Sequence, residues 1–198
     1  MRAMRIHETG GPDVLRWEQV SRPEPAAGQV RVRVRAAGVN FIDIYHRSGL
    51  YPMPLPFIPG QEGAGEVDAV GEGIEEFREG DRVAWASITG SYAEYAIVPV
   101  ASLVSLPDDV PFELAAAVML QGMTAHYLAF STFRLGEEHR CLIHAAAGGV
   151  GLLLIQMAKR QGAMVIGTVG SSEKAERILA AGADAAILYR EEDPADGV

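Results

Sequence analysis

Short stretches in the first part of the chain alternate between apolar and polar residues with a period of two. The clearest is 30–36 (VRVRVRA), where three valines alternate with Arg31, Arg33 and Arg35. This pattern is typical of a strand with one buried and one solvated face, so we expect the three arginines to face solvent. Many short strands at such spacing indicate a barrel or a sandwich. The strands expected in this region cover residues 2–7, 14–18, 30–36, 63–70, 81–86 and 91–98.

Two other segments interrupt this β-rich region. Asn40 is a favourable N-cap residue, and it predicts a short helix over residues 41–47. Four prolines between residues 50 and 60 predict an extended connection, because proline lacks a backbone donor and restricts the residue before it.

The pattern changes after Pro107. Apolar periodicity predicts helices over 111–119 and 124–133, and strands and helices then alternate from residue 138 onward. Such alternation is typical of a parallel sheet with covering helices. The strands expected there cover 140–144, 164–169 and 185–189, and the helices cover 150–160 and 172–181. We therefore predict an α/β fold with a β-rich partner domain, and domains at 1–122 and 123–198.

Residues 141–169 form the unit around which the second domain is expected to be built. A predicted strand is followed by closely spaced glycines and then by an apolar helix pattern. In the dinucleotide fingerprint G-x-G-x-x-G the marked positions fall at Ala146, Gly148 and Gly151, so alanine replaces the first glycine. Glycines there let backbone N–H groups at the helix N-terminus approach a pyrophosphate. A plain structural turn is the alternative, but the flanking strand, helix and strand favour a cofactor site.

The tip of the next strand, which reads TVGSSEK, indicates the kind of dinucleotide. An NAD site usually places a carboxylate at this tip to hold the ribose 2′-hydroxyl, and none is present here. Ser171 and Ser172 can donate hydrogen bonds, Lys174 can offset a 2′-phosphate, and Arg177 follows one helical turn later. The serines could equally cap the helix, and Glu173 could complement its dipole. The segment therefore favours NADP over NAD.

Composition and charge narrow the classes of partner. The formal net charge is −9 and no dense block of lysine and arginine occurs, which argues against nucleic acid as the main partner. The single cysteine, Cys141, excludes an internal disulfide and fits a reducing compartment. The first residues lack the apolar core of a signal peptide, and nowhere do about 18 apolar residues run together. We therefore expect a cytoplasmic protein that does not bind a membrane.

Six segments occur in the order shown by a known family, namely 38–43 (GVNFID), 59–65 (PGQEGAG), 80–83 (GDRV), 144–151 (HAAAGGVG), 167–175 (GTVGSSEKA) and 189–193 (YREED). Through them the chain resembles the quinone oxidoreductases of the zeta-crystallin type, within the medium-chain dehydrogenase/reductase superfamily. The resemblance implies an N-terminal GroES-like β-barrel domain with catalytic function. It also implies the first half of a Rossmann doubly wound parallel sheet after it.

The same resemblance bears on metal chemistry. Zinc-dependent relatives carry a cysteine where this chain has Asn40, and Gly-His-Glu where it has Gly60-Gln61-Glu62. Neutral amides bind zinc poorly, whereas a catalytic zinc uses thiolate and imidazole ligands. A single cysteine also cannot form the four-cysteine structural lobe of those relatives. We expect no metal site, which favours reduction of an electron-poor acceptor.

The resemblance implies NADPH-dependent reduction of quinones by hydride transfer, with the 40–45 segment against the nicotinamide. Taken without the resemblance, Asn40 and Asp43 are ordinary at a helix start, and Tyr127 fits a core position on an apolar helix. His46, His126 and His144 are expected to be structural. The candidate catalytic residues are Asn40, Tyr45 and Tyr51, and the candidate cofactor-binding residues are Phe41, Ile42, Asp43, Ile44, Tyr45, Tyr127, Gly148, Gly149, Val150, Gly170, Ser171, Ser172, Glu173, Lys174 and Tyr189.

Other activities stay open at this point. Reduction of an enoyl or other α,β-unsaturated carbonyl compound needs a proton donor, for which Tyr45 and Tyr51 are the candidates. Family members are longer by well over a hundred residues, so we expect either a fragment or a chain completed by a partner, and by resemblance a homodimer. A cofactor-binding or structural module without turnover is the alternative from a different functional class.

Overall fold

The computed structural model describes residues 1–191. They form two compact units, Met1–Leu120 and a second unit that begins at Gln121. Each unit is described by itself below. Glu192 and Asp193, the last two residues of the 189–193 segment, lie outside the described residues. Within residues 1–191, no helix combines the length and the apolar character that crossing a bilayer requires.

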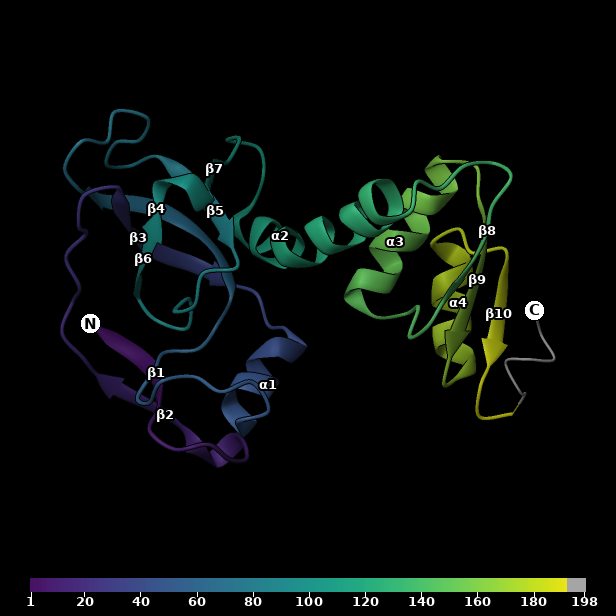
Figure 1. Cartoon of the computed structure of the whole chain (residues 1–198), viewed down its shortest axis with the longest axis horizontal. Coiled ribbons are helices and arrows are strands. Elements are labelled where there is room, and N and C mark those ends of the chain that lie inside the picture. The colour runs from purple at the N-terminus through teal and green to yellow at the C-terminus, as the bar shows by residue number, and fades with distance from the viewer. Residues whose placement is uncertain (192–198) are drawn as a thin grey trace. The chain divides into compact units, whose positions relative to one another are not determined.

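The first unit is built on a five-stranded antiparallel sheet in the order β6-β3-β4-β5-β7 (Figure 1). Two further strands form a separate hairpin. Isolated β-bridges join this hairpin to the rest of the unit, one between Ala3 and Ala93 and one between Ile6 and Phe57. The strands are β1 (Arg2–Ile6), β2 (Leu15–Gln19), β3 (Gln29–Ala37), β4 (Glu62–Val70), β5 (Arg82–Ala86), β6 (Tyr95–Pro99) and β7 (Leu103–Ser105), with short 3₁₀ turns η1 (Pro12–Val14) and η2 (Val100–Ser102). The β-rich character expected for this part of the chain is confirmed.

The valines of β3, which recur at every second position, point into the core of this unit. Val32 lies opposite Val67 of β4 and Ala96 of β6, so apolar side chains from three neighbouring strands meet on one face. Trp85 of β5 is fully buried in the same cluster. Burial of this apolar surface is the main stabilising contribution to the sheet.

The arginines of β3 do not all face solvent as expected. Arg33 and Arg35 are exposed and both pair with Glu66 on β4. Arg31, however, is only 7% exposed, and its guanidinium donates to Asp68 at 2.6 Å and to Glu24 at 2.6 Å. The expectation for Arg31 was wrong because the loop before β3 covers it and supplies a carboxylate, so that the buried charge is paired.

A single helix, α2 (Phe112–His126), replaces the two helices expected over 111–119 and 124–133. The one glycine between the predicted helices, Gly122, costs only about 1 kcal/mol in a helix interior and does not end it. The helix is followed by a π-helical turn, η3 (Tyr127–Thr132). Ala115 and Ala116 of α2 pack against Ala64 and Ala84 of the sheet. Small side chains on both sides let the helix lie close to the strands.

The second unit alternates strands and helices as predicted. It contains β8 (Arg140–Ile143), α3 (Gly149–Arg160), β9 (Met164–Val169), α4 (Ser172–Ala180) and β10 (Ala185–Leu188). The three strands are parallel in the order β10-β9-β8, with α4 packed on β9 and β10 and α3 packed on β9 (Figure 1). Ile155 of α3, Val165 of β9 and Ile178 of α4 are fully buried in one core. These features confirm the α/β fold class with a β-rich partner domain.

Candidate functional site

The glycine-containing turn between β8 and α3 has the geometry of a phosphate-binding loop. Gly148 is the N-cap residue of α3, and its N–H donates to the Ala145 carbonyl at 2.9 Å. A side chain on Gly151 is excluded, because its Cβ would lie 2.5 Å from the Ala146 carbonyl oxygen. Gly151 therefore allows the first turn of α3 to lie against the loop, as the third glycine of the fingerprint does.

The alanine that replaces the first fingerprint glycine is fully buried, and the unusual backbone lies one residue earlier. Ala145 has a φ of 49°, in the left-handed region that L-residues with a side chain rarely adopt. Ala146 packs its methyl group into the core with Ile155 and Ile178. Gly149 and Val150, predicted to lie at the pyrophosphate, are the first two residues of α3.

The carboxyl ends of the three parallel strands enclose a hollow of about 190 Å³, called here the β8–β10 hollow. Four predicted cofactor residues, which come from three separate loops, meet in it. Ligands of open α/β sheets bind at this edge of the sheet. The residues that line the hollow are Ala145, Ala147, Gly148, Val169, Gly170, Lys174 and Tyr189.

The β9–α4 loop contributes the polar side of the hollow. Ser171 is the N-cap residue of α4, but its side chain makes no capping hydrogen bond, and Ser172 and Glu173 begin the helix exposed to solvent. Lys174 lines the hollow, whereas Arg177 does not. A cation that the sequence did not indicate, Arg190, has its Nε 3.5 Å from the position of a Cβ on Gly170. Its place directly after Tyr189 was the available signal.

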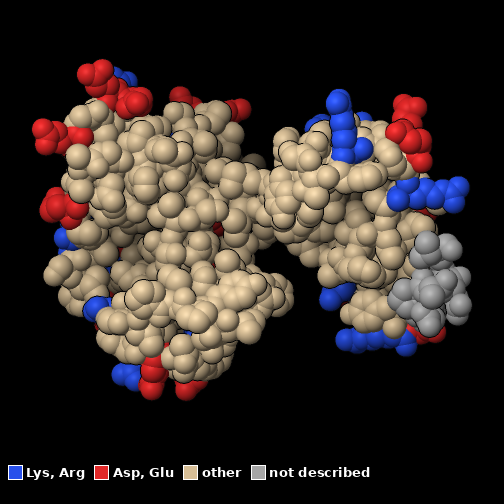
Figure 2. All heavy atoms as spheres, in the orientation of Figure 1, with Lys and Arg blue, Asp and Glu red and all other residues tan. Residues whose placement is uncertain are grey.

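Charged side chains are dispersed over the surface. On the face shown in Figure 2, lysine and arginine side chains are scattered among aspartate and glutamate and do not gather into one basic patch.

The predicted nicotinamide-side segment lies at the start of helix α1 (Phe41–Ser48) in the first unit. Asn40 is its N-cap residue, and the Asn40 backbone N–H donates to Asp43 Oδ2 at 2.9 Å. The Tyr92 hydroxyl donates to the same oxygen at 2.8 Å, and burial beside the Asp43 carboxylate raises the pKa of Tyr92. Asp43 is therefore buried beneath the helix start, where it connects α1 to the loop that precedes β6.

Glu62, which the sequence did not single out as a site residue, lies directly behind Asn40. Its side chain is 0% exposed, Oε1 accepts from Asn40 Nδ2 at 2.6 Å, and Oε2 accepts from the Leu120 backbone N–H at 2.6 Å. Burial raises the pKa of the Glu62 carboxyl, and the two donors counteract that shift in part. Sequence reasoning missed this residue because its partners are 22 positions before it and 58 positions after it.

Two tyrosines proposed for catalysis lie together, Tyr45 on α1 and Tyr51 in the loop that follows the helix. The rings of Tyr45 and Tyr51 are 5.3 Å apart at 58°, and the Tyr51 N–H donates to the Tyr45 carbonyl at 3.1 Å. Phe41 stands 6.5 Å from Tyr45 and is 75% exposed, and Ile44 is also exposed, while Ile42 is half-buried. Helix α1 and the loop after it thus present large apolar side chains together with two tyrosines.

The other side chains discussed in the sequence analysis, Tyr127 and three histidines, line neither the β8–β10 hollow nor the larger hollow of the first unit. Tyr127 begins the π-helical turn and is half exposed, so it does not occupy the core position that was the alternative reading. His144 Nδ1 lies 3.2 Å from Thr168 Oγ1, and the His126 ring stacks on Phe130. His46 is a buried residue of α1 itself.

The side chains at the positions discussed for zinc do not fit that metal. Asn40 turns its NH₂ group to Glu62, and Gln61 donates its own NH₂ group to Thr89 Oγ1 at 2.6 Å. Amide nitrogens that donate hydrogen bonds offer no lone pair to a cation. Among residues 1–191, no group of three or more His, Cys, Asp or Glu side chains could hold a metal ion.

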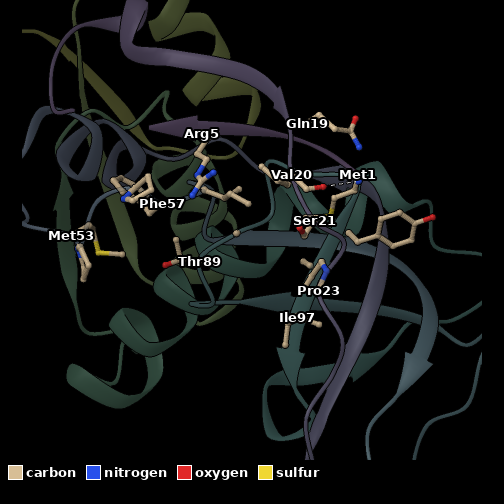
Figure 3. A pocket seen from close by; sticks show the side chains of 16 residues that line it. Met1, Arg5, Gln19, Val20, Ser21, Pro23, Met53, Phe57, Thr89 and Ile97 are labelled. Carbon is tan, nitrogen blue, oxygen red and sulfur yellow. Dashed lines mark hydrogen bonds between the residues drawn. The ribbon is translucent and has the colours of Figure 1, made fainter. Parts of the chain in front are cut away.

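A larger hollow of about 840 Å³ lies elsewhere in the first unit and is shown in Figure 3. None of the predicted site residues lines it. Thr89, the partner of Gln61, is at its edge, together with Arg5, Met53 and Phe57.

Comparison with known families assigns both parts of the chain. Residues 26–108 match the family model described as alcohol dehydrogenase GroES-like domain, and residues 149–198 match the model described as zinc-binding dehydrogenase. Together with the architecture, these matches confirm the expected GroES-like and Rossmann folds.

Individual relatives match nearly the whole length of the chain. A quinone oxidoreductase of Pseudomonas aeruginosa is 50% identical over 188 residues, covering 94% of this chain and 58% of the relative. A 2-haloacrylate reductase of Burkholderia is 41% identical over 201 residues, covering 98% of this chain and 60% of the relative. The structure of Escherichia coli quinone oxidoreductase complexed with NADPH superposes with a TM-score of 0.97 at 43% identity, covering 100% of this chain and 61% of that one. The chain thus spans about three fifths of the length of these relatives.

Proposed function

Because the chain belongs to the zeta-crystallin type of the medium-chain dehydrogenase/reductase superfamily, we propose that the full-length protein reduces quinones with NADPH by hydride transfer. The observation that carries the proposal is the β8–β10 hollow. It places a helix N-terminus, a lysine and a tyrosine around one space at the carboxyl edge of a parallel sheet. The relative of known structure that superposes on the chain binds NADPH.

The residues of the hollow fit an NADP-type dinucleotide. Backbone N–H groups at Gly149 and Val150, in the first turn of α3, can receive the pyrophosphate at the positive end of the helix. Lys174 supplies the charge that a 2′-phosphate requires, and Arg190 brings a second cation close to Gly170. Neither Asp nor Glu is among the described residues that line the hollow, so no carboxylate there would repel the phosphate.

Bound NADPH supplies the hydride, and the α1 region supplies position and hydrogen bonds. Asn40 offers an amide held against Glu62, and Tyr45 and Tyr51 offer hydroxyl groups beside the apolar surface of Phe41. An electron-poor aromatic acceptor is suited to such a surface because flat rings stack on aromatic side chains. Quinone reduction needs no committed general acid, since the reduced quinone takes its proton from water.

The reaction is proposed to be zinc-independent. The family model for the second unit carries a zinc-binding description, but Asn40 and Gln61 donate hydrogen bonds where a zinc enzyme would use a thiolate and an imidazole. Metal analysis of fully active protein tests this point. A stoichiometric zinc content that disappears together with activity on chelation contradicts it.

One observation favours a second activity, the reduction of α,β-unsaturated carbonyl compounds. A relative that is 41% identical is a 2-haloacrylate reductase, and such a reduction uses a proton donor. The adjacent hydroxyl groups of Tyr45 and Tyr51 are the candidates for this donor. If one of them is the acid, its replacement by phenylalanine lowers enoyl turnover and leaves quinone turnover unchanged.

We also propose a homodimer in the cytoplasm. The family resemblance supports the dimer, and the single cysteine supports a reducing compartment. Light scattering on the purified full-length protein measures the oligomeric state directly.

The main experiment follows NADPH oxidation by the full-length protein with 1,4-benzoquinone. We expect turnover with NADPH and much weaker turnover with NADH. Tight NADPH binding without turnover of quinones or enoyl compounds would instead support a cofactor-binding module. Equal affinity for NADH and NADPH would overturn the role given to Lys174.

A further inference from the structure

Resting on the proposed function, we propose that Glu62 is a positioning residue that fixes the orientation of the Asn40 amide. Asn40 stands at the start of α1, and its Nδ2 donates to Glu62 Oε1 at 2.6 Å. With the NH₂ group on Glu62, the amide oxygen lies on the opposite branch of the side chain. That oxygen is a hydrogen-bond acceptor, and the capping box at the start of α1 turns it towards the backbone N–H of Asp43.

The orientation is decided by the second partner of Glu62. The Leu120 backbone N–H donates to Oε2 at 2.6 Å, and a backbone N–H can only donate. A carboxylate offers acceptors on both oxygens, so the Asn40 amide must turn its NH₂ group towards the other one. The alternative, with the amide oxygen against a carboxylate oxygen, places two acceptors together without a proton between them.

The cost of such a buried carboxylate suggests that its position is useful. Glu62 is 0% exposed, and a buried charge is expensive unless its hydrogen-bonding capacity is met. Its two hydrogen bonds join three parts of the first unit: the residue before α1, the first residue of β4 and the C-terminal part of α2. Because the backbones of β4 and α2 hold two of these parts, the Asn40 side chain is the part that Glu62 orients.

Replacing Glu62 by glutamine, which has nearly the same shape, should reverse the orientation of the Asn40 amide. In Glu62→Gln, the oxygen of the introduced amide must accept from Leu120, which leaves the introduced NH₂ group facing the NH₂ group of Asn40. Asn40 then rotates its amide by half a turn, so that its oxygen accepts from the introduced NH₂ group while its own NH₂ group takes the opposite side. The group that faces away from residue 62 changes from an acceptor to a donor.

A second substitution restores the original polarity. In Asn40→Asp/Glu62→Gln, one aspartate oxygen accepts from the glutamine NH₂ group and the other replaces the original amide oxygen as an acceptor. The pair keeps one formal negative charge. Asn40→Asp alone places two carboxylates against each other, and we expect it to be the least stable of the three variants.

The experiment compares the wild type, the two single variants and the double variant of the full-length protein. Quinone turnover, the emission spectrum of bound NADPH, the affinity for 2′,5′-ADP and the thermal midpoint are measured for each. We expect Glu62→Gln to lower kcat roughly tenfold or more, as for a misplaced buried hydrogen bond. NADPH emission should shift, 2′,5′-ADP affinity should stay unchanged, and the double variant should recover most of the kcat and the emission.

The control is Glu66→Gln, the same chemical change further along β4, where the carboxylate pairs with Arg33 and Arg35 at the surface. It should leave turnover and emission unchanged. Unchanged kcat and emission in Glu62→Gln overturn the proposal, as does a double variant that regains stability but not emission or kcat. A wild type that binds NADPH without turnover overturns the proposed function instead, and the emission of the variants then decides the role of Glu62.

Discussion

The hydroxyl of Tyr189 lies where a side chain on Gly170 would have to go. A Cβ built at Gly170 would stand 2.6 Å from the Tyr189 oxygen and 3.0 Å from its Cζ. The two residues follow neighbouring parallel strands, β9 and β10, and both line the β8–β10 hollow. We expect their contact to limit the width of the hollow on the side proposed to hold the adenosine.

Replacing Gly170 by alanine should therefore weaken adenosine binding. The added methyl displaces the Tyr189 ring, and such overpacking costs roughly 1–3 kcal/mol, which predicts a loss of affinity for 2′,5′-ADP of about tenfold. Calorimetry on Gly170→Ala measures the loss. In a protein that already carries Tyr189→Phe, Gly170→Ala should reduce 2′,5′-ADP affinity less, because the Tyr189 hydroxyl oxygen, the atom nearest to the added methyl group, is absent. An equal loss of affinity with and without Tyr189→Phe would show that the contact with this hydroxyl is not the cause.

Lys174 should determine the choice between NADPH and NADH. In Lys174→Ala the Kd for NADPH should rise roughly tenfold through loss of a charge-assisted hydrogen bond, and the Kd for NADH should hardly change. Arg177→Ala is the matched control, since Arg177 is on the same helix but does not line the hollow. Equal weakening of both dinucleotides would place Lys174 away from the 2′-phosphate.

Two alanine-to-glycine substitutions one residue apart should have opposite effects on stability. At Ala145, whose φ is 49°, glycine relieves a strain of roughly 1–2 kcal/mol and costs about 0.4–1 kcal/mol in chain entropy, so a net gain of about 0.5 kcal/mol is expected. At the fully buried Ala146, glycine loses a packed methyl group as well as entropy, and a loss of about 1–2 kcal/mol is expected. Denaturant unfolding followed by circular dichroism compares them, and effects of the same sign would contradict the assigned backbone strain.

The ion pair between Lys159 and Asp184 should make stability depend on pH. Lys159 Nζ lies 2.8 Å from Asp184 Oδ2, the Val165 N–H donates to the same oxygen at 2.7 Å, and these donors lower the pKa of Asp184. A lowered pKa means that the stabilisation is present above the usual pKa of an aspartate and is lost as pH falls through the folded-state value. Asp184→Asn should therefore melt at a lower temperature than the wild type near pH 7.

The difference between the two proteins should begin to shrink as the pH falls below about 4, because the unfolded wild-type chain then takes up a proton at Asp184. It should disappear below the lowered folded-state pKa, where the Asp184 carboxyl is neutral in the native protein as well. The exposed Asp108→Asn serves as the control and should melt like the wild type at both pH values. A difference between Asp184→Asn and wild type that persists unchanged at low pH would mean that packing, and not the charge, is responsible.

Local sequence pattern predicted much of the fold because the relevant physics is local. The strand at 164–169 and the helix beginning at Ser172 follow from apolar periodicity and from glycines at the loops, and both were confirmed. Arg31 was assigned to solvent because alternation says which face a side chain is on, but not which distant loop covers that face. The prediction of two helices over 111–119 and 124–133 was wrong, because apolar periodicity did not show that the segment between them continues the helix.

The candidate site was predictable to the extent that its residues are neighbours in sequence. The loops around Gly148 and Lys174 could be read from their spacing, and the structure brings them into one hollow. Glu62 could not be found in that way, since its partners Asn40 and Leu120 become neighbours only once β4 has paired with β5 and α2 has packed on the sheet. Arg190 was missed because no spacing rule places it near Gly170.

The burial of Trp85 has a practical spectroscopic consequence. The chain has two tryptophans, the fully buried Trp85 and the half-exposed Trp17, and both belong to the first compact unit. Intrinsic tryptophan fluorescence will therefore report the unfolding of that unit alone. If the Rossmann unit melts separately, tryptophan fluorescence will not change during its transition. The fluorescence of bound nucleotide or circular dichroism will then be needed to detect that transition.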